Sequence, residues 1–425
     1  MGAEAVSNLM RERTVQMPFV YVRKRTGRWN AEGEFMTETK NAVSLETGRM
    51  DADAESSILR QLCDGKPEIT GYDKELYSRI KLGWDHVAKP LDSMGTFEEV
   101  LSEIGAIQGQ LIPAVSKSCI LVCCADNGIV EEGVSQSGQE ITAICADNIA
   151  NGRSSVAIMA KQTGTDIHAV DIGINGDFEI PNVRNLKVRK GTRNFLKEPA
   201  MTESEVLQAL RTGMELVREH REQGYTILGI GEMGIGNTTT ASAVTAALLN
   251  LPAGEVTGRG AGLDDRKLNH KIQVIRQALE QWNLSEKSAF EILRTVGGLD
   301  IACMAGICIG GALWHVPVVL DGFISLAAAL AACRMVPGAR EYLIASHSGK
   351  EPAMQKIEKE LELSPVIYAR MALGEGTGAV LMLSLLKTAN AVYESSCSFA
   401  DAGIGQYQRY EGVCETAEKE QTETE

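Results

Sequence analysis

Basic side chains are in the minority in this sequence of 425 residues. Lys and Arg together number 42 against 56 Asp and Glu, which gives a formal net charge of −14 at pH 7. A negative field of this size repels the phosphates of nucleic acids and the headgroups of anionic membranes. We therefore expect no nucleic acid and no membrane among the partners of this protein.

Long apolar runs are also lacking. The basic N-terminal segment, residues 1–28, contains no apolar stretch of the kind that a secretory signal requires. The uncharged stretch at residues 301–320 is interrupted by His315 and Pro317, so we interpret it as a buried helix followed by a buried strand and not as a membrane span. We expect a cytoplasmic protein.

Histidine is scarce, and the ten cysteines form no CxxC pair. Only six histidines are present and none lies close to a cysteine in the sequence, whereas zinc sites usually draw on closely spaced ligands of these two types. Several cysteines fall inside apolar runs, at residues 118–125 and 301–314. We predict buried, reduced thiols, no metal site and no cofactor.

The two ends of the chain differ in composition from its middle. Residues 1–70 are polar and only weakly periodic, and residues 415–425 (ETAEKEQTETE) are acidic. We predict a poorly ordered N-terminal arm, a central α/β domain, two helical segments that join as a smaller helical domain, and an acidic tail. Their predicted bounds are 1–70 for the arm, 71–110 and 377–404 for the helical segments, 111–376 for the α/β domain and 405–425 for the tail.

Between these ends, apolar runs alternate with helical patterns. The apolar runs are continuous, which is typical of parallel strands that are covered on both faces. They lie at residues 119–125, 167–172, 225–230 and 316–320. Helical periodicity is found at residues 74–108, 141–163, 203–222, 239–250, 267–282, 288–295, 301–314, 324–333 and 377–394. This order predicts an α/β fold with a doubly wound, mainly parallel sheet, helices on both faces, and ligands beyond the carboxyl ends of the strands.

A first glycine-rich loop, residues 231–240 (GEMGIGNTTT), directly follows a predicted strand and opens a helix. Glycines let the backbone approach an anion, and the unpaired N–H groups of a helix start point toward it. No lysine follows the last glycine, so this is not the phosphate loop of the nucleoside triphosphatases. The loop predicts a phosphate site, although a plain strand-to-helix turn could contain the same glycines.

A second glycine-rich loop, residues 374–378 (GEGTG), places Glu375 at the start of another helix. Ser, Asp or Asn would cap a helix better than Glu, so a glutamate at this position indicates a role beyond capping. A helix N-terminus favours the ionised carboxylate, which can accept a proton. Glu375 is thus a candidate proton acceptor, unless it is only a surface side chain stabilised by the helix dipole, and together with Glu232 of the first loop it gives two glycine-flanked carboxylates on two strand-end loops.

Smaller features accompany the two loops. A further glycine-rich turn, residues 258–262, leads to a helix that carries Lys271, which either pairs with a phosphate or carboxylate or lies solvated on the helix surface. We interpret His347 as structural, because neither a Ser/His/Asp order nor an HExxH motif is present. No acidic pair followed by TGGT occurs, which disfavours the magnesium-dependent ribosyltransferases that release pyrophosphate.

The sequence resembles the nicotinate-nucleotide:dimethylbenzimidazole phosphoribosyltransferases, which act in the assembly of the cobamide nucleotide loop. The resemblance runs from about residue 78 to residue 404, and GEMGIGNTT together with LGEGTGA is its most specific part. The motifs that carry it are AKPLDSMG (88–95), ADNGIVEEGVSQSGQEIT (125–142), KGTRNF (190–195), GEMGIGNTTTASA (231–243), TGRGAGL (257–263), VPVVLDGFI (316–324), ASHSGKEP (345–352) and LGEGTGA (373–379).

The resemblance implies roles for particular residues. Glu375 would be the catalytic base, Glu232 would assist it, and Gln139 would lie in the base pocket. The substrate-binding residues that it implies are Gln139, Met233, Gly234, Ile235, Gly236, Asn237, Thr238, Gly260, Lys271, Gly322 and Leu373, with no metal ligand.

The implied reaction transfers the phosphoribosyl group of nicotinate mononucleotide to 5,6-dimethylbenzimidazole or a related base. The pyridinium leaving group departs as a neutral ring and needs no general acid, whereas the incoming azole must lose its N–H proton, so one carboxylate can suffice. The products are nicotinate and α-ribazole 5′-phosphate, and neither a metal nor a redox cofactor is required. The family forms homodimers, so we expect a homodimer.

The sequence departs from the family pattern at a few positions. Asn127 often corresponds to His in the family, Gly138 to Pro and Gly349 to a second serine, while Glu131 stands where relatives can touch the base. The reaction class is unaffected, but substituted benzimidazoles, adenine and phenols all remain candidate acceptors.

Two other functional classes share part of this pattern. One is a non-catalytic nucleotide-binding regulator of the same fold, which is disfavoured because binding a phosphate requires neither Glu232 nor Glu375. The other is a nucleoside triphosphatase, which the missing lysine of the first loop disfavours.

Overall fold

The computed structural model describes residues 27–29, 35–37, 52–64 and 69–409. The chain divides into two compact units, Met1–Val43 and Ser44–Glu425. In the first unit, the short strands β1 (Gly27–Trp29) and β2 (Phe35–Thr37) pair in antiparallel fashion. All other elements named below belong to the second unit.

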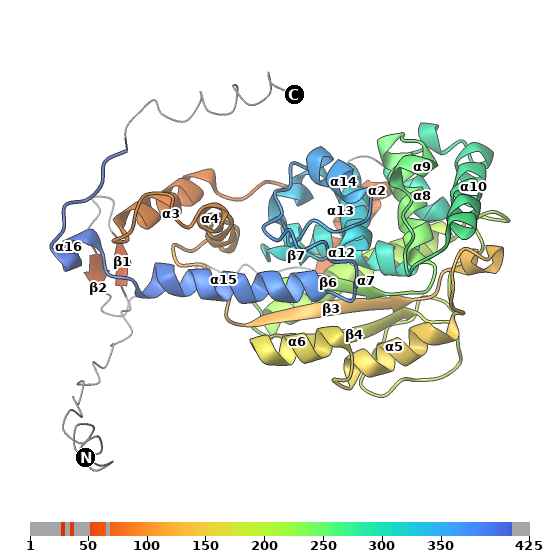
Figure 1. Ribbon diagram of the computed structural model, residues 1–425, viewed down its shortest axis with the longest axis horizontal. Helices are drawn as coiled ribbons and strands as arrows, with labels where there is room; N and C mark the ends of the chain where they lie inside the picture. The colour runs from red at the N-terminus through yellow and green to blue at the C-terminus, as the bar shows by residue number, and fades with distance from the viewer. Residues whose placement is uncertain (1–26, 30–34, 38–51, 65–68, 410–425) are drawn as a thin grey trace, which may run out of the picture. The chain divides into compact units, whose positions relative to one another are not determined.

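A six-stranded parallel sheet forms the centre of the second unit, with the strand order β5-β4-β3-β6-β7-β8 (Figure 1). The strands are β3 (Ser118–Ala125), β4 (Asp166–Gly173), β5 (Arg184–Asn185), β6 (Ile227–Met233), β7 (Val318–Leu320) and β8 (Leu343–Ala345). The chain runs outward from β3 to β5, then returns to β6 and runs outward the other way. This confirms the predicted doubly wound α/β fold and puts the topological switch point between β3 and β6, where such sheets bind ligands.

Strand β3 shows why the apolar runs were continuous, since all of its eight residues are buried. Cys119, Leu121 and Cys123 belong to a core shared with the helices α7 and α12, whereas Ile120 and Val122 belong to a second core. The second core is shared with α5, α6 and α15 on the opposite face of the sheet. Helices therefore cover both faces (Figure 1).

The predicted helices are present within a few residues at their ends, with two helices, α3 and α4, in the stretch 74–108, whereas α2, α9 and α14 have no predicted counterpart. The region 141–163, predicted as one helix, forms α5 and α6, because the chain turns at Gly152 with a φ of 75°. The helices are α2 (Ala52–Asp64), α3 (Lys74–His86), α4 (Thr96–Gln108), α5 (Glu140–Ala150), α6 (Ser155–Thr163), α7 (Glu203–Glu222), α8 (Asn237–Leu249), α9 (Ala253–Val256), α10 (Asp265–Gln281), α11 (Ala289–Val296), α12 (Leu299–Leu313), α13 (Phe323–Met335), α14 (Met354–Glu360), α15 (Thr377–Ser395) and α16 (Phe399–Ala402), with short 3-10 turns at Gly128–Glu132, Leu284–Glu286 and Pro337–Tyr342.

Helix α2 corrects the prediction of a poorly ordered arm over residues 1–70. Its Ile58 and Leu59 are buried in the main core, and its Glu55 accepts a hydrogen bond from Nε of Arg218 on α7 at 3.0 Å. The 13 residues of α2 include only three large apolar side chains, Ile58, Leu59 and Leu62, within a polar region, so the helix is easily missed without the surface that receives it. Most of the remaining arm lies outside the described residues, as do residues 410–425 of the predicted acidic tail.

The predicted helical segments on either side of the α/β domain are present as α3, α4, α15 and α16. Helix α3 packs on α4, and α4 contacts α15. These helices nevertheless belong to the same compact unit as the sheet. The reason is visible in α15, since its Ala379, Leu383 and Leu386 form part of the core on one face of the sheet.

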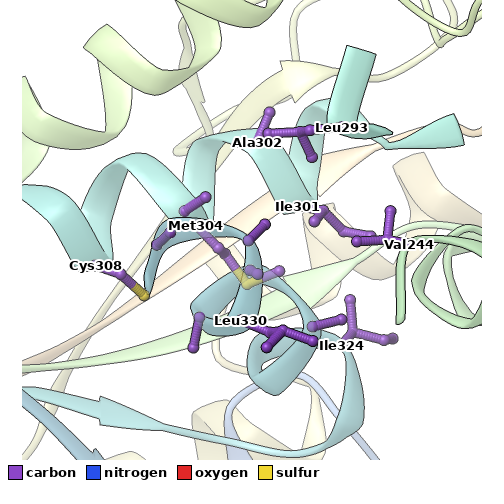
Figure 2. Close-up of a cluster of buried hydrophobic side chains, with 14 of the residues drawn as sticks. Val244, Leu293, Ile301, Ala302, Met304, Cys308, Ile324 and Leu330 are labelled. Atoms are coloured by element: carbon purple, nitrogen blue, oxygen red, sulfur yellow. The ribbon is translucent and has the colours of Figure 1, made fainter. Parts of the chain in front are cut away.

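The apolar stretch at 301–320 lies inside the core. Figure 2 shows Ile301, Met304 and Cys308 of α12 beside Ile324 and Leu330 of α13. Among the described residues, no helix is long and apolar enough to cross a membrane.

The cysteines whose side chains are described are free thiols, and most are buried, as predicted, while Cys397 is exposed. Two histidines that are distant from the cysteines in the sequence nevertheless approach one of them in space. The Sγ of Cys119 lies within 4.8 Å of ring nitrogens of His168 and His220. The strand pairing of β3 with β4 and the return of α7 bring together residues that are distant in the sequence.

We predict that Gly306→Ala destabilises the protein. A Cβ at Gly306 of α12 would lie 2.2 Å from the backbone carbonyl oxygen of Leu210 on α7, so the two helices would have to move apart. We expect a loss of about 1–3 kcal/mol in the free energy of unfolding, measured by urea denaturation. The control is Gly254→Ala in α9, where a Cβ would meet no atom within 4 Å. Equal stability of the two variants would contradict the close helix packing.

Candidate active site

The two predicted glycine loops lie against each other at the carboxyl edge of the sheet. A Cβ at Gly231 of β6 would lie 2.5 Å from the backbone oxygen of Glu375, so glycine is required for this approach. Parallel strands deliver their following loops to one edge, which explains how segments more than a hundred residues apart meet here.

Glu375 has an unusual backbone conformation. Its φ is 61°, and its neighbours Gly374 and Gly376 have φ values of 84° and 93°. Glycine adopts this left-handed region freely, but any other residue there costs roughly 1–2 kcal/mol. A strained non-glycine residue persists only where the surrounding structure holds it, and such residues cluster at functional sites.

Asp321 is the residue that holds this loop. It follows β7 and is almost completely buried, and its carboxylate accepts hydrogen bonds from the backbone N–H groups of Gly376 at 3.1 Å, Gly378 at 2.6 Å and Ala379 at 3.3 Å. It therefore caps α15 from a different part of the chain, because Gly376 at the N-cap has no side chain to do so.

The carboxylate of Glu375 is placed at the wall of a cavity. Its Oε2 is buried and has no hydrogen-bond partner in the described part of the chain. Burial raises the pKa of Glu375, and this effect is partly offset by a hydrogen bond from the backbone of Val156 at the start of α6. A partly desolvated carboxylate with an unsatisfied oxygen is poised to accept a proton from a ligand.

Glu232 lies next to this loop and is more deeply buried. Burial, with the nearby carboxylate of Asp300 as a second cause, raises the pKa of Glu232 to about 8. The Nδ2 of Asn237 donates hydrogen bonds to both Glu232 and Asp300, the latter at 3.2 Å, and the backbone of Glu375 also hydrogen-bonds Glu232. Burial raises the pKa of Asp300 to about 6. The two glycine loops are thus joined through a buried carboxyl group.

A cavity of about 330 Å³ opens between these loops. Most of the predicted site residues line it. They are Glu232, Met233, Gly234, Ile235, Asn237, Thr238, Gly260, Gly322, Leu373 and Glu375. A volume of this order suits a small organic ligand. Apolar side chains, among them Phe323 and Met371, form part of the cavity wall.

A smaller cavity of about 80 Å³ adjoins the first and contains the other two predicted residues of this region, Gly236 and Lys271. The Lys271 ammonium is buried and donates to Thr238 Oγ1 at 2.9 Å and to the backbone oxygen of Gly258 at 3.3 Å. Burial lowers the pKa of Lys271 to about 8, and the carboxylate of Glu351 opposes this shift. A buried cation beside glycine-rich backbone and a helix start is an arrangement that binds a phosphate group.

Gln139 lies outside the main cavity. Its Nε2 donates to the backbone oxygen of Asn127 at 3.1 Å, and its Oε1 accepts from Asn175 at 2.9 Å. It lines a neighbouring polar cavity of about 420 Å³ that also contains Arg189 and Arg193.

The sequence reasoning missed several residues of the site. Asp321, His347 and Glu351 line the main cavity, and Asp300 lies directly behind Glu232. For Asp321 the sequence did contain a signal, since an Asp-Gly pair ends a buried strand, but only the glycine was selected. His347 was interpreted as structural, yet its imidazole lies at the cavity wall against Gly378, where a Cβ would come within 2.0 Å of Nδ1.

Comparisons with known proteins agree with this geometry. A family profile described as Phosphoribosyltransferase matches residues 69–404. The nicotinate-nucleotide–dimethylbenzimidazole phosphoribosyltransferase of Ruminiclostridium cellulolyticum is 42% identical over 327 residues, which cover 77% of this chain and 93% of the relative. The enzyme of the same name from Clostridium acetobutylicum is 39% identical over 339 residues, which cover 80% of this chain and 96% of the relative.

A solved structure is similar over the same region. The crystal structure of CobT from Thermus thermophilus superposes with a TM-score of 0.74 at 37% identity, covering 78% of this chain and 100% of that chain. The match to the family profile includes the six-stranded sheet, both glycine loops and the cavity between them. The chain therefore belongs to the nicotinate-nucleotide–dimethylbenzimidazole phosphoribosyltransferase family.

Proposed function

We propose that this protein transfers the phosphoribosyl group of nicotinate mononucleotide to 5,6-dimethylbenzimidazole or a related base. The products are nicotinate and the α-ribazole 5′-phosphate used for the lower nucleotide loop of cobamides. The observation that carries the proposal is Glu375 itself, which lines the cavity and has a buried Oε2 without a hydrogen-bond partner in the described part of the chain. The names of the relatives support the same reaction.

Glu375 is the general base of the proposed reaction. Its carboxylate takes the N–H proton of the incoming base while the ring nitrogen forms a bond to C1′ of the ribose. The bond from C1′ to the pyridinium nitrogen of nicotinate breaks, and its electron pair makes that ring neutral. The attack occurs opposite the leaving group and inverts C1′ to the α configuration, with no step that requires a metal or a redox cofactor.

Lys271 anchors the phosphate of the nucleotide in this proposal. Its buried ammonium, Thr238 and the backbone around Gly236 and Gly260 surround the smaller cavity. A phosphate bound there fixes the ribose beside the larger cavity, so that C1′ and the base are held in an attacking geometry.

Burial and the nearby carboxyl of Asp300 raise the pKa of Glu232 to about 8 and so favour its protonated form in the absence of ligand. A bound nicotinate ring carries positive charge on its pyridinium nitrogen, which favours ionisation of a nearby carboxyl. Glu232 then stabilises positive charge that develops at C1′.

The acceptor base lies against the apolar part of the cavity in this proposal. Phe323, Met354, Met371 and Leu373 line that part, which suits a flat aromatic ring. Asn127 does not line this cavity; it is buried near Asp300, and its Oδ1 accepts a hydrogen bond from Thr240 at 2.9 Å.

We also propose that the protein works as a homodimer in the cytoplasm. Ile144 of α5 and Ile158 of α6 are more than half exposed on neighbouring helices, which supports a covering partner.

The proposed reaction is tested by incubating the purified full-length protein with nicotinate mononucleotide, with and without 5,6-dimethylbenzimidazole. We expect nicotinate release that requires the base, with equal formation of α-ribazole 5′-phosphate, measured by chromatography. Nucleotide binding without release, over a panel that includes other benzimidazoles, adenine and phenols, would contradict catalysis and favour a nucleotide-binding regulator.

We predict that Glu375→Gln lowers the turnover number about 10²–10⁴-fold, because the proton acceptor is removed. Nucleotide binding, measured by calorimetry, should persist, since the phosphate site is built from other residues. The matched control is Glu362→Gln, which changes an exposed glutamate that also has a positive φ, of 52°. Turnover near the wild-type value in Glu375→Gln would rule out this residue as the base.

We predict that Glu232→Gln makes the protein more stable at alkaline pH. The pKa of Glu232 is raised from 4.5 to about 8 on folding, mainly by burial, so between these values the folded chain holds a proton that the unfolded chain has released. Stability therefore falls as pH rises through this window and is flat above it. Urea unfolding should show a gain for Glu232→Gln at about pH 9 and little change at about pH 4. If Glu232→Gln changed the free energy of unfolding by the same amount at both pH values, the pKa of Glu232 would not be raised by folding.

A further inference from the structure

A cluster of possible metal ligands lies at the amino-terminal edge of the sheet, at the opposite ends of the strands from the cavity. Cys119 is at the start of β3, His168 is near the start of β4, and His220 is in the last turn of α7. The Sγ of Cys119 and one ring nitrogen of each histidine all lie within 4.8 Å of one another. The nucleotide chemistry proposed above makes no use of this cluster.

The register of the sheet explains why these side chains meet. Cys119 pairs with Asp166, and Leu121 pairs with His168, so the cysteine and the histidine lie on the same face of two neighbouring strands. That face is covered by α7, whose His220 is buried. Tyr225 closes the cluster, since its ring centroid is 6.0 Å from that of His168 and 5.3 Å from that of His220.

The hydrogen bonds of His220 define its tautomer. Its Nδ1 is 2.7 Å from the backbone oxygen of Leu216, which can only accept, so Nδ1 carries the proton and Nε2 presents a lone pair. That Nε2 is 2.7 Å from Nδ1 of His168. A metal-bound histidine usually donates its other ring N–H to a backbone carbonyl or a carboxylate in this way.

The surroundings of the other two ligand atoms also suit a metal ion. Cys119 is completely buried at the start of β3, and its Sγ lies beside the two imidazoles. Asp166 is exposed at the edge and accepts a hydrogen bond from the Tyr225 hydroxyl at 2.7 Å. His168 is only partly buried, so an ion can enter from this edge, and Asp166 or a water molecule can complete four-coordination.

We propose that Cys119, His168 and His220 bind one divalent cation of the zinc class. One thiolate with two imidazoles is a donor set that selects zinc and chemically similar ions over magnesium or calcium. The ion takes the place of the hydrogen between the two imidazoles, so the proton on His168 moves from Nδ1 to Nε2. The thiol of Cys119 loses its proton to solvent, and one proton is released for each ion bound.

Binding requires only small movements. Tetrahedral zinc with Zn–N bonds of about 2.0–2.1 Å separates two imidazole nitrogens by roughly 3.3 Å. The two nitrogens are now 2.7 Å apart, so the rings must part by about half an ångström while the sulfur moves inward. The ion would tie the end of α7 to β3 and β4 and so stabilise the edge of the sheet opposite the catalytic loops.

The test is titration of the metal-stripped, reduced full-length protein with Co²⁺, followed by displacement with Zn²⁺. We expect one Co²⁺ per chain, with a thiolate-to-cobalt charge-transfer band and the intense visible bands of a four-coordinate site. Zn²⁺ should abolish these bands and raise the melting temperature. Proton release in weak buffer gives an independent count.

Variants decide which side chains are responsible. Cys119→Ser should remove the charge-transfer band, and His220→Gln should weaken binding by more than the roughly 10–100-fold that loss of an outer hydrogen-bonding partner costs. If His220→Gln does not fold, His168→Gln provides the same test, because His168 is only partly buried and its replacement disturbs the core less. The control is Cys397→Ser, which removes an exposed thiol at a distant position.

Two results would overturn the proposal. One is a wild-type protein that binds no Co²⁺ with a thiolate band, in which case the two histidines simply hydrogen-bond to each other. The other is a band that survives in Cys119→Ser or disappears in Cys397→Ser, in which case another thiol holds the metal. Nicotinate release should be unaffected in the folded variants, which separates this site from the proposed active site.

Discussion

The hydrogen bonds from the start of α15 to the carboxylate of Asp321 are the interaction on which the site depends. They join the end of β7 to the loop that carries Glu375, and they do so without water, because Asp321 is buried. A left-handed glutamate next to two left-handed glycines would otherwise relax to a more favourable backbone. The hydrogen bonds that cap α15 thus also hold the backbone of Glu375 in its left-handed conformation.

The same edge of the sheet gathers several buried carboxyl groups. Burial raises the pKa values of Glu232, Asp300 and Asp321, and Asn237 bridges the first two. Such a cluster disfavours negative charge in the absence of ligand, and a ligand with a positively charged ring relieves this cost. The buried Lys271 lines the smaller cavity, whereas Glu232 and Asp321 line the larger one, so the basic group and the acidic groups belong to two adjoining cavities.

Much of this arrangement could be predicted from the sequence, because the signals were local. Continuous apolar runs gave the parallel strands, and glycines around Glu232 and Glu375 marked two loops that the sheet brings together. The short strands β5 and β8 carry too few residues for a pattern, and α2 becomes recognisable only through the surface on which Ile58 and Leu59 pack.

Other features depend on contacts between distant segments, which no local pattern encodes. The role of Asp321 requires the start of α15 to lie beside the end of β7, and the approach of Cys119 to His168 and His220 requires the pairing of β3 with β4 under α7. The six histidines are too widely spaced in the sequence to predict a metal site. The fold brings two of them, His168 and His220, to Cys119.

The most direct test of this account is a double-mutant cycle that combines Asp321→Asn with Glu375→Gln. Asparagine keeps the size of the side chain but turns an amide group toward the backbone N–H groups of the loop. If Asp321 acts by holding Glu375, the single change lowers the turnover number about 10–100-fold with little effect on the KM for the nucleotide, and it lowers turnover no further when Glu375 is already glutamine. An equal loss in both backgrounds would contradict the account, because Asp321 would then act independently of the glutamate.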